Sequence, residues 1–338
     1  MSARAQILPV FVPHLGCMHA CVFCNQRRIS GAQSPARPED VKNLTAQSAA
    51  FLPQGGKRQL AFYGGSFTAI PEKEQEALLS AAKEALDRGE IDAIRLSTRP
   101  DAIDDTVLAR LRRYGVGTVE LGAQSMDDGV LRQSGRGHTA ADVARASALV
   151  RAAGFELVLQ MMTGLPGSDD EKDVETARRL IALKPDGVRV YPTVIVRDTP
   201  LYDMWRSGAY REHTVEDAVR VCAVLVPLFE AAGIPIIRLG LNPTEELSGG
   251  AAVAGAYHPA LGELVKSRVL LNKVRALLQT AAPGSRVTIT VGKGKTSQMT
   301  GQKRENLRRL TEEFRLAELR VRENPAESGE IPALSIEK

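Results

Sequence analysis

The sequence predicts an α/β protein built on a parallel sheet or barrel, with a smaller α+β lobe after it. Three observations carry this prediction. Strand-like and helix-like segments alternate along the first two thirds of the 338 residues. The composition is globular, with 43% hydrophobic and 25% charged residues but only 4% aromatic residues, which argues against a large sandwich or propeller. After about residue 245 the regular alternation of expected strands and helices ends. Strands that alternate with helices require a parallel sheet or barrel.

Six β-α units precede residue 192. The expected strands are short runs rich in apolar and β-branched residues, at 7–12, 60–63, 93–98, 117–122, 155–162 and 187–191. The expected helices between them are 39–51, 72–86, 104–114, 139–153 and 170–183. Pro38 and Pro71, each followed by an acidic residue, suit the first turn of a helix. The pair formed by helix 215–232 and strand 234–239 is a candidate for one more unit.

We place a domain boundary after residue 245, so that residues 1–245 form the core and residues 246–338 form a basic lobe with a tail. A Gly/Ala stretch at 248–257 opens a long helical pattern at 258–278. A strand at 286–291, a Gly/Lys loop, a helix at 301–313 and a strand at 314–322 follow. The last dozen residues have the composition of a loose tail.

The composition also bears on the cellular location of the protein. No apolar run reaches the roughly 18 residues of a membrane span, so we expect no membrane association. The first residues contain no signal-peptide core, and we expect a cytoplasmic protein. Three of the four cysteines, Cys17, Cys21 and Cys24, lie within eight residues, whereas Cys222 stands alone in an apolar helix and is expected in the core. A cytosolic chain uses such a cluster for metal or redox chemistry rather than for disulfides.

Charge is distributed unevenly along the chain. The formal net charge is +4, but residues 266–322 carry 14 Lys and Arg against 4 Asp and Glu, a local net charge of +10. The remaining residues have a net charge of −6. This asymmetry suggests a polyanionic partner, and a solvated helical surface is the alternative. The candidate nucleic-acid contacts lie in or just after the Gly/Lys loop: Lys293, Lys295, Lys303, Arg304, Arg308 and Arg309.

The strongest motif is the cysteine cluster, whose spacing is C-x3-C-x2-C directly after the first expected strand. Three thiolates on a short loop can hold three irons of a cubane cluster and leave the fourth iron open to a small molecule. Two alternatives compete with this interpretation. The three cysteines could form a Cys3His zinc site with His14 or His19, or they could be unliganded core residues.

The same motif resembles the signature of the radical S-adenosylmethionine (radical SAM) superfamily, and the aromatic Phe23 before the third cysteine matches as well. The resemblance implies a [4Fe–4S] cluster held by Cys17, Cys21 and Cys24, with its open iron chelated by S-adenosylmethionine (SAM). It also implies a partial, six-unit TIM-like (β/α) barrel, in agreement with the units counted above. In such a barrel the ligand lies at the carboxyl ends of the strands.

Residues at these strand ends are the candidate SAM contacts. The resemblance implies that the Gly-Gly turn after the second strand holds the amino group of SAM, which makes Gly64, Gly65, Ser66 and Thr68 candidates. It implies that Gln124, Arg136 and Gln160 contact the ribose and the carboxylate. Ser97 occupies a position where some family members carry Glu. Glu120 is a further cofactor-binding candidate, with a buried ion pair to a nearby Arg as the alternative, because a polar group inside an apolar strand must be satisfied.

A narrower resemblance, to the group of Elongator catalytic subunits, covers roughly residues 7–322. It rests on motifs along the chain: Val119-Glu120-Leu121-Gly122-Ala123-Gln124-Ser125, Arg136-Gly137-His138-Thr139, Tyr191-Pro192-Thr193, Leu201-Tyr202 and Gly255-Ala256-Tyr257-His258-Pro259-Ala260. Members of this group modify the wobble uridine of tRNA. Two departures are evident, since the characterised subunits space their cysteines more widely and carry an acetyltransferase domain beyond the point where this chain ends. We therefore expect an Elongator-like, stand-alone form.

The resulting expectation is a radical SAM enzyme. An external low-potential donor of the flavodoxin or ferredoxin type supplies one electron, SAM is cleaved to methionine and a 5′-deoxyadenosyl radical, and the radical abstracts hydrogen from a substrate, with tRNA as the leading candidate. No residue is assigned to the hydrogen-transfer step itself. One alternative is a radical SAM enzyme that acts on a small metabolite, as its coproporphyrinogen-oxidase-like relatives do. The other is a zinc-binding nucleic-acid module.

Overall fold

The computed structural model describes residues 6–12, 15–17, 21–32, 34–51, 56–324 and 332–337. The chain divides into two compact units. The first unit contains Met1–Thr214 and Leu228–Tyr257, and the second contains Val215–Pro227 and His258–Lys338. This division differs from the boundary expected after residue 245, because residues 252–255 form a strand that pairs inside the first unit.

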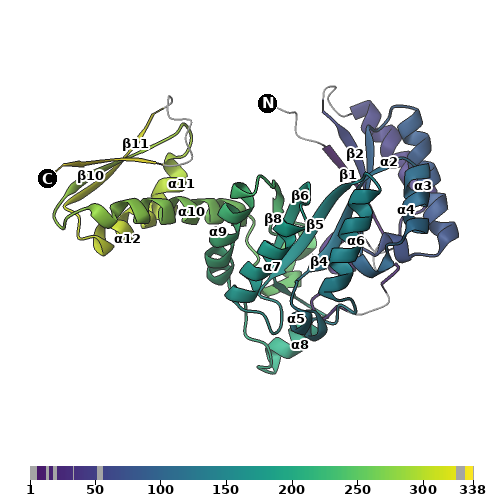
Figure 1. Cartoon of the computed structure of the whole chain (residues 1–338), viewed down its shortest axis with the longest axis horizontal. Helices are drawn as coiled ribbons and strands as arrows, with labels where there is room; N and C mark the ends of the chain where they lie inside the picture. Colours follow the sequence, from purple (N-terminus) through teal and green to yellow (C-terminus); the bar gives the residue numbers. More distant parts are fainter. Residues whose placement is uncertain are drawn as a thin grey trace. The chain divides into compact units, whose positions relative to one another are not determined.

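The first unit is built on a seven-stranded parallel sheet that curls into a half-barrel (Figure 1). Its strand order is β1-β2-β3-β4-β5-β6-β8, so each strand lies beside its predecessor in the chain apart from the insertion before β8. The strands are β1 (Gln6–Phe11), β2 (Arg58–Tyr63), β3 (Ala93–Thr98), β4 (Val116–Gln124), β5 (Glu156–Thr163), β6 (Gly187–Pro192) and β8 (Ile236–Leu239). The prediction of a partial, TIM-like α/β barrel is confirmed.

Helices cover the outer face of this sheet (Figure 1). They are α2 (Pro38–Phe51), α3 (Glu72–Asp87), α4 (Asp105–Arg113), α6 (Ala140–Ala152) and α7 (Asp170–Ala182). Side-chain caps set where several of them begin: Asp104 accepts from the backbone N–H of Val107, and Thr139 forms a capping box with Asp142. The apolar side of each strand packs under these helices, with Leu60, Phe62, Leu96 and Leu121 completely buried.

The inner face of the half-barrel is polar. Paired residues of parallel strands point to the same face, and the register aligns Gly122 with Gln160 and Gln160 with Arg189. Glu120, two positions before Gly122, lies opposite Ser97 on the same face. The chain thus separates an apolar outer core from an inner face that carries charged and amide side chains.

Several elements of the first unit were not expected from the sequence. Two short helices, α5 (Asp128–Gln133) and α8 (Pro200–Arg206), follow β4 and β7. An antiparallel ribbon pairs β7 (Val194–Val196) with β9 (Ala252–Gly255), and a single turn, η3 (Leu247–Ala251), precedes β9. The Gly/Ala stretch expected to open the second lobe therefore belongs to the first unit. Gly255, at φ +87°, passes so close to Thr193 that a Cβ would lie 2.8 Å from its carbonyl oxygen.

The second unit is a three-stranded sheet packed on helices. Its strands β11 (Glu318–Glu323), β10 (Arg286–Val291) and β12 (Ala333–Glu337) lie in the order β11-β10-β12. Its helices include α10 (Leu261–Leu277), α11 (Thr296–Thr300) and α12 (Glu305–Glu313), together with Val215–Pro227, which is most of α9 (Val215–Ala231). Buried apolar residues of α10, β10 and α12 form one core, with Val274, Ile289 and Leu310 completely buried.

Two expectations for this unit are wrong. The last residues are not all a loose tail, because β12 pairs antiparallel with β10. The helix expected at 301–313 begins only at Glu305, because Gly301 ends α11 and because Lys303 and Arg304 take left-handed backbone conformations at φ +49° and +61°. In the part of the chain that the structure describes, no helix has the length and apolar character needed to span a membrane.

Candidate cofactor site at the mouth of the half-barrel

The cysteine loop follows β1 at the edge where all the parallel strands end. The backbone N–H of Val12 continues the β1–β2 pairing by donating to the carbonyl oxygen of Tyr63. Further along the loop, Val22 donates to the carbonyl oxygen of Ser134, and Leu201 donates to that of Val22. These backbone bonds fasten the loop to α5 and α8, so the cysteines lie at the carboxyl mouth of the half-barrel, where the family resemblance expects the cofactor.

The three clustered cysteines are free thiols at this mouth, and Cys222 is buried in the core as expected. Cys21 and Cys24 are half-buried, while Cys17 is exposed. His14 and His19, the imidazoles considered for a zinc site, lie outside the described residues. Within the described ranges, no three His, Cys, Asp or Glu side chains are arranged to hold a single metal ion.

Two glycines allow the cysteine loop and the turn after β2 to pack backbone against backbone. A Cβ on Gly16, whose φ is +70°, would lie 2.2 Å from the carbonyl oxygen of Ser66. A Cβ on Gly65 would lie 2.4 Å from the carbonyl oxygens of both Val12 and Leu15. Ser66 N–H donates to the Leu15 carbonyl oxygen at 2.9 Å. Gly65, expected to admit SAM, therefore has a second function, because it lets the turn hold the cysteine loop.

The hydroxyl groups that follow this turn already have partners. Thr68 is buried, and its Oγ1 lies 2.7 Å from Thr98 Oγ1 and donates to the carbonyl oxygen of Ala102 at 2.7 Å. Burial and the neighbouring Cys21 raise the pKa of the Cys17 thiol, and a hydrogen bond from the Ser66 hydroxyl opposes that rise. Ser66 thus contacts a cysteine, whereas the Thr68 side chain stabilises the turn through its bonds to Thr98 and Ala102.

Glu120 lies on the inner face and is fully occupied by protein groups. Its carboxylate accepts from Arg95 Nη1 at 2.9 Å, from Arg189 Nε at 2.8 Å and from the Tyr63 hydroxyl at 3.0 Å. Arg189 also donates to the Tyr63 hydroxyl at 2.8 Å. Burial, followed by the charge of Glu120, raises the pKa of Tyr63 above its usual range. Of the two interpretations of Glu120, the structure contains the buried ion pair, and it holds Tyr63 directly before the Gly64-Gly65 turn.

Gln124 ends β4 in a strained conformation. Its φ is +64° although it is not glycine, and the β4–β5 register shifts between Gly122 and Gln124. The Gln124 side chain is buried and accepts a hydrogen bond from Gln160 Nε2 at 3.2 Å. A bulge and a left-handed residue at a strand end are typical of functional sites, because they redirect a side chain at a cost of about 1–3 kcal/mol. The two glutamines predicted to bind the cofactor are therefore adjacent.

Arg136 contacts both the carboxyl end of β4 and the cysteine loop. Its Nη1 lies 3.1 Å from Cys21 Sγ, and its Nη2 donates to the carbonyl oxygen of Gly122 at 2.8 Å. A Cβ on Gly122 would lie 2.9 Å from Gln124 Nε2 and 3.3 Å from Arg136 Nη2. Gly122 is therefore the small residue that leaves room for both side chains. On the other side of the loop, Gln26 Nε2 donates to Cys24 Sγ at 3.3 Å.

Two titratable groups of this mouth, Cys24 and His138, are shifted toward their neutral forms. Burial, followed by the nearby Cys21, raises the pKa of the Cys24 thiol to about 12. Burial and the charge of Arg136 lower the pKa of His138 to about 4, so this imidazole is neutral at neutral pH and donates from Nε2 to the Ala123 carbonyl oxygen. A metal that binds the three cysteines must displace their protons, so its affinity rises with pH.

The residues at this mouth fit a cubane cluster with SAM on its open iron. Three cysteines supply soft thiolate ligands, which is the donor set of iron–sulfur clusters. The Nε atom of Arg136 is buried without a hydrogen-bond partner among the described residues, while its Nη1 lies 3.1 Å from Cys21 Sγ, so a cationic group stands beside the cysteines. Glycines line both sides of the loop. No fourth cysteine lies beside the three, because Cys222 is in the core.

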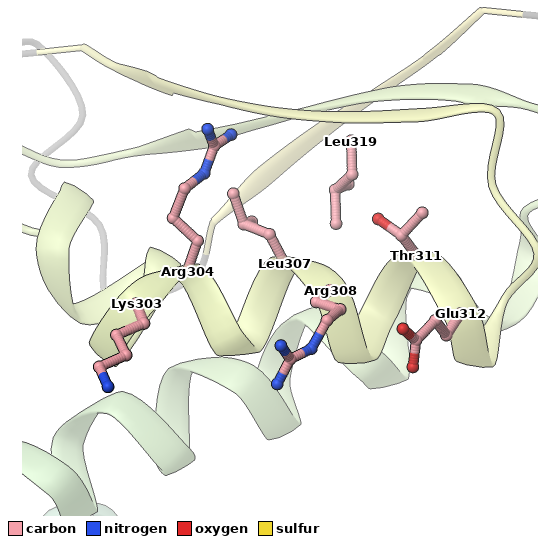
Figure 2. A pocket seen from close by; sticks show the side chains of 7 residues that line it. All are labelled: Lys303, Arg304, Leu307, Arg308, Thr311, Glu312 and Leu319. Carbon is pink, nitrogen blue, oxygen red and sulfur yellow. The ribbon is translucent and has the colours of Figure 1, made fainter.

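The candidate nucleic-acid residues lie in the second unit. Lys303, Arg304 and Arg308 line a cavity of about 320 Å³ between α12 and β11, together with Leu307, Thr311, Glu312 and Leu319. Figure 2 shows that Arg304 and Leu307 extend from α12 toward the strands, whereas Lys303 and Arg308 extend to the other side of the helix. Lys293 and Lys295 lie between β10 and α11, whereas the other four predicted residues lie on α12 or directly before it, so the six are spread over two segments.

Ion pairs reduce the charge excess that the sequence indicates. Several cations of residues 266–322 are paired with carboxylates: Lys266 with Glu263, Arg268 with Glu216, Arg275 with Glu313, Arg309 with Glu305 and Arg320 with Glu318. Glu216 and Glu263 lie outside the counted segment. Of the six candidates, Arg309 is therefore partly neutralised, while Lys293, Lys303, Arg304 and Arg308 are exposed.

Sequence reasoning missed three residues of the mouth. Arg95 and Arg189 hold Glu120, and Gln26 contacts Cys24. The two arginines carry the same signal that identified Glu120, since each is a charged residue inside an otherwise apolar strand. Gln26 is the first residue of the short helix α1 (Gln26–Ser30) and carries no such signal, because a polar residue in the first turn of a helix is ordinary.

Comparison with known proteins gives consistent matches. A model of the Radical SAM superfamily matches residues 11–180, half of the chain, and a model of the Radical SAM C-terminal domain matches residues 185–270. Human Elongator complex protein 3 is 31% identical over 192 residues, which cover 51% of this chain and 35% of the human protein. The tRNA uridine(34) acetyltransferase of Methanocaldococcus infernus is 28% identical over 198 residues, 57% of this chain and 37% of that protein.

A solved structure shares the fold. The Elongator protein Elp3 of Methanocaldococcus infernus, with an N-terminal deletion, superposes with a TM-score of 0.63 at 21% identity, over 79% of this chain and 63% of that chain. The matched part of this chain spans about a third of the length of the curated relatives. The likeness to the solved structure concerns the fold.

Proposed function

The chain belongs to the radical SAM superfamily, whose enzymes use a [4Fe–4S] cluster and SAM, and we propose that Cys17, Cys21 and Cys24 hold this cluster. The observation that carries the proposal is the three-thiol loop fastened at the mouth of the half-barrel, with Gly16 and Gly65 in backbone contact. Three cysteines leave one iron without a protein ligand. We assign that iron to SAM.

The chain's own residues orient and enclose these groups. When bound, the cluster and SAM supply the one-electron chemistry that generates a 5′-deoxyadenosyl radical. Gln124 and Gln160 lie side by side where they can offer hydrogen bonds to the ribose, and the turn from Gly64 to Ser66 offers backbone groups to the amino end. Arg136 carries a permanent charge beside Cys21. The buried network around Glu120 keeps Tyr63 and its turn in place, which preserves the spacing that the chemistry needs.

We propose tRNA as the substrate and the second unit as its docking surface. The relatives named above include a tRNA uridine(34) acetyltransferase, and the residues around α12 carry exposed cations. Lys303, Arg304 and Arg308 line the cavity between α12 and β11 and are exposed, whereas Leu307 and Leu319, which also line it, are buried in the core, so the surface offers mainly charge. Contacts of this kind to phosphates release counterions, and the resulting affinity falls steeply with salt.

Two further assignments complete the proposal. A low-potential donor of the flavodoxin or ferredoxin type supplies the electron, because the chain's described residues include no second cysteine cluster that could relay one. We also propose a cytoplasmic location, since reduced thiols persist there.

The first experiment tests the cluster. The protein is purified and reconstituted anaerobically, and iron, sulfide and 5′-deoxyadenosine formed with dithionite and SAM are measured. We expect about four irons and four sulfides per chain, by the cluster type. Cys17→Ala, Cys21→Ala and Cys24→Ala each remove the cluster, and Cys222→Ala, the matched control, leaves it intact. One zinc without sulfide would sink the radical SAM proposal and support a zinc module.

The second experiment tests the partner. Bulk tRNA is titrated at two ionic strengths into the wild type, a K303A/R304A/R308A variant and a K73A/R132A/R178A control that removes the same charge from exposed sites of the first unit. We expect binding to weaken at least tenfold in the α12 variant and little in the control, with a shallower salt dependence. Equal binding by all three proteins, or no binding at low salt, would favour a small-metabolite substrate.

A further inference from the structure

We propose that Arg136 sets the reduction potential of the cluster by donating a charged hydrogen bond to the sulfur of one of its ligands, Cys21. The inference rests on the proposed function, because it requires Cys21 to be a cluster ligand. It gives Arg136 an action on the cluster that is separate from the contact with the SAM carboxylate expected above.

The geometry of Arg136 is that of a fixed donor. Nη1 lies 3.1 Å from Cys21 Sγ, within the range of an N–H···S hydrogen bond. Nη2 is tied to the Gly122 carbonyl oxygen at 2.8 Å, and the Arg136 carbonyl oxygen accepts from Arg99 Nη2 at 3.0 Å. The second bond holds the backbone of Arg136, whereas the bond from Nη2 to Gly122 holds the planar guanidinium itself and limits the orientation of its fork.

Two neighbours of Arg136 bear on its position and on the charge beside Cys21. Gly122 has no Cβ where one would lie 3.3 Å from Arg136 Nη2. The neighbouring imidazole of His138 is neutral at neutral pH, because burial and then Arg136 lower its pKa to about 4. Arg136 therefore contributes the permanent positive charge that directly contacts a cluster cysteine among the described residues.

The redox consequence follows from the charges. Three thiolates on an oxidised [4Fe–4S]²⁺ core give a total charge of −1. Reduction adds one electron from an external one-electron donor, moves no proton and brings the total charge to −2. A fixed cation beside a ligand sulfur stabilises the more negative state, and hydrogen bonds to the sulfurs act in the same direction. Arg136 thus makes the cluster easier to reduce.

A second hydrogen bond provides an internal comparison. Gln26 Nε2 donates to Cys24 Sγ at 3.3 Å, but the amide is neutral and its bond is longer. A hydrogen bond from a charged donor is roughly twice as strong as a neutral one. The arginine should therefore contribute the larger part of the shift.

The test measures the reduction potential directly. Wild type, R136M, R136K, Q26L and R132M are reconstituted anaerobically, their iron and sulfide are counted, and dithionite titrations without SAM are followed by electron paramagnetic resonance. Arg132 is an exposed arginine on α5, so R132M removes the same charge at a distance. We expect R136M to shift the reduction equilibrium at least tenfold toward the oxidised form, about 59 mV for one electron. R136K and Q26L should shift it less, and R132M should not shift it.

Each outcome decides the question. An R136M cluster with the wild-type potential, or an equal shift in R132M, would overturn the inference while the cluster assignment stands. If R136M does not retain iron, R136Q, which keeps a neutral donor, must show a shift in the same direction, and an unshifted R136Q would overturn the inference instead. A wild type without a four-iron cluster would overturn the proposed function itself.

Discussion

The mouth of the first unit and the surface around α12 use charged residues in opposite ways. At the mouth, Glu120 is 1% exposed and is held by two arginines and a tyrosine. Around α12, Lys303, Arg304 and Arg308 are exposed, and Arg309 pairs with Glu305 on the same helix. A buried charge destabilises the fold unless it is matched, whereas an exposed one contributes at most about 1 kcal/mol. Charges at the mouth are thus fixed by packing, and those on α12 are free to meet a partner.

Because of this difference, the two regions must be tested by different experiments. A buried polar residue must find its partner inside the protein, because an unpaired one would destabilise the fold. An exposed cation does not identify a partner by its position alone, so its role is seen only when the partner binds. The mouth can therefore be tested by stability and cofactor loading, while the α12 surface requires a binding experiment.

The largest expected effect comes from Glu120→Gln. The variant keeps the shape of the side chain but leaves Arg95 and Arg189 buried without a counter-charge. Breaking a buried pair in this way costs about 3–5 kcal/mol. We expect the free energy of unfolding of the first unit, measured by urea titration under anaerobic conditions, to fall by that amount.

The matched control for this substitution is Glu312→Gln, which changes the exposed carboxyl group beside the α12 cavity. We expect a change within about 0.5 kcal/mol, as for most surface substitutions. Similar losses in the two variants would show that the contrast between the two regions is mistaken.

A smaller effect is expected from Gly65→Ala. The added Cβ meets the carbonyl oxygens of Val12 and Leu15 at 2.4 Å, so the turn and the cysteine loop must separate. Overpacking of this kind costs about 1–3 kcal/mol. We expect less iron per chain after reconstitution, because the cysteines follow the displaced loop, and a lower midpoint of thermal unfolding.

Gly262→Ala is the control for Gly65→Ala. Gly262 lies in α10, and a Cβ there meets no atom within 4 Å. Because alanine favours a helix over glycine by about 1 kcal/mol, this variant should be as stable as the wild type or more so, with unchanged iron. Unchanged iron in Gly65→Ala as well would mean that the close packing of the two loops is not needed for loading.

The smallest effect concerns pH and His138. Its pKa is lowered to about 4 in the folded protein against 6.5 for a free imidazole, so the unfolded chain takes up a proton first as the pH falls. The stabilisation is therefore complete above pH 6.5 and is lost as the pH falls toward 4. Between pH 7 and pH 5 the loss is about 2 kcal/mol.

The check compares wild type with His138→Gln by urea unfolding at pH 7 and pH 5. The variant lacks the titrating ring, so the stability difference between the two proteins should shrink by that amount at pH 5. Buried Asp173, whose pKa burial raises to about 6, titrates in the same window but is present in both proteins and cancels. A difference that is independent of pH would contradict the assignment of a neutral imidazole.

Much of the half-barrel was predictable because its signals are local and repeated. Apolar strands ending in Gly64-Gly65 or Gln124, alternating with capped helices, identify both the parallel sheet and the edge where ligands bind. The extra strand β8 followed from the same pattern. The cysteine spacing then identified the chemistry, since few sites use three thiols within eight residues.

The contacts of individual residues were less predictable, because they depend on positions far apart in the sequence. Nothing near Gly65 indicates that its neighbours are Val12 and Leu15, some fifty residues earlier. β7 and β9 are only three and four residues long, and although Val194-Ile195-Val196 is a β-branched run, neither segment indicates its partner. Their pairing decides which unit residues 252–255 join. The charge count of residues 266–322 cannot show such pairing either, since Arg268 pairs with Glu216, which lies outside the counted segment.

The position of β12 has a consequence for how the second unit can be altered. β10 lies in the middle of its sheet because β12 covers one of its sides, from Arg286 opposite Glu337 to Thr290 opposite Ala333. Removing Ala333–Glu337 would turn β10 into an edge and leave a row of backbone N–H and C=O groups without partners. Such an edge is a template for the strand of another molecule, so a shortened chain is expected to self-associate rather than merely lose a few residues.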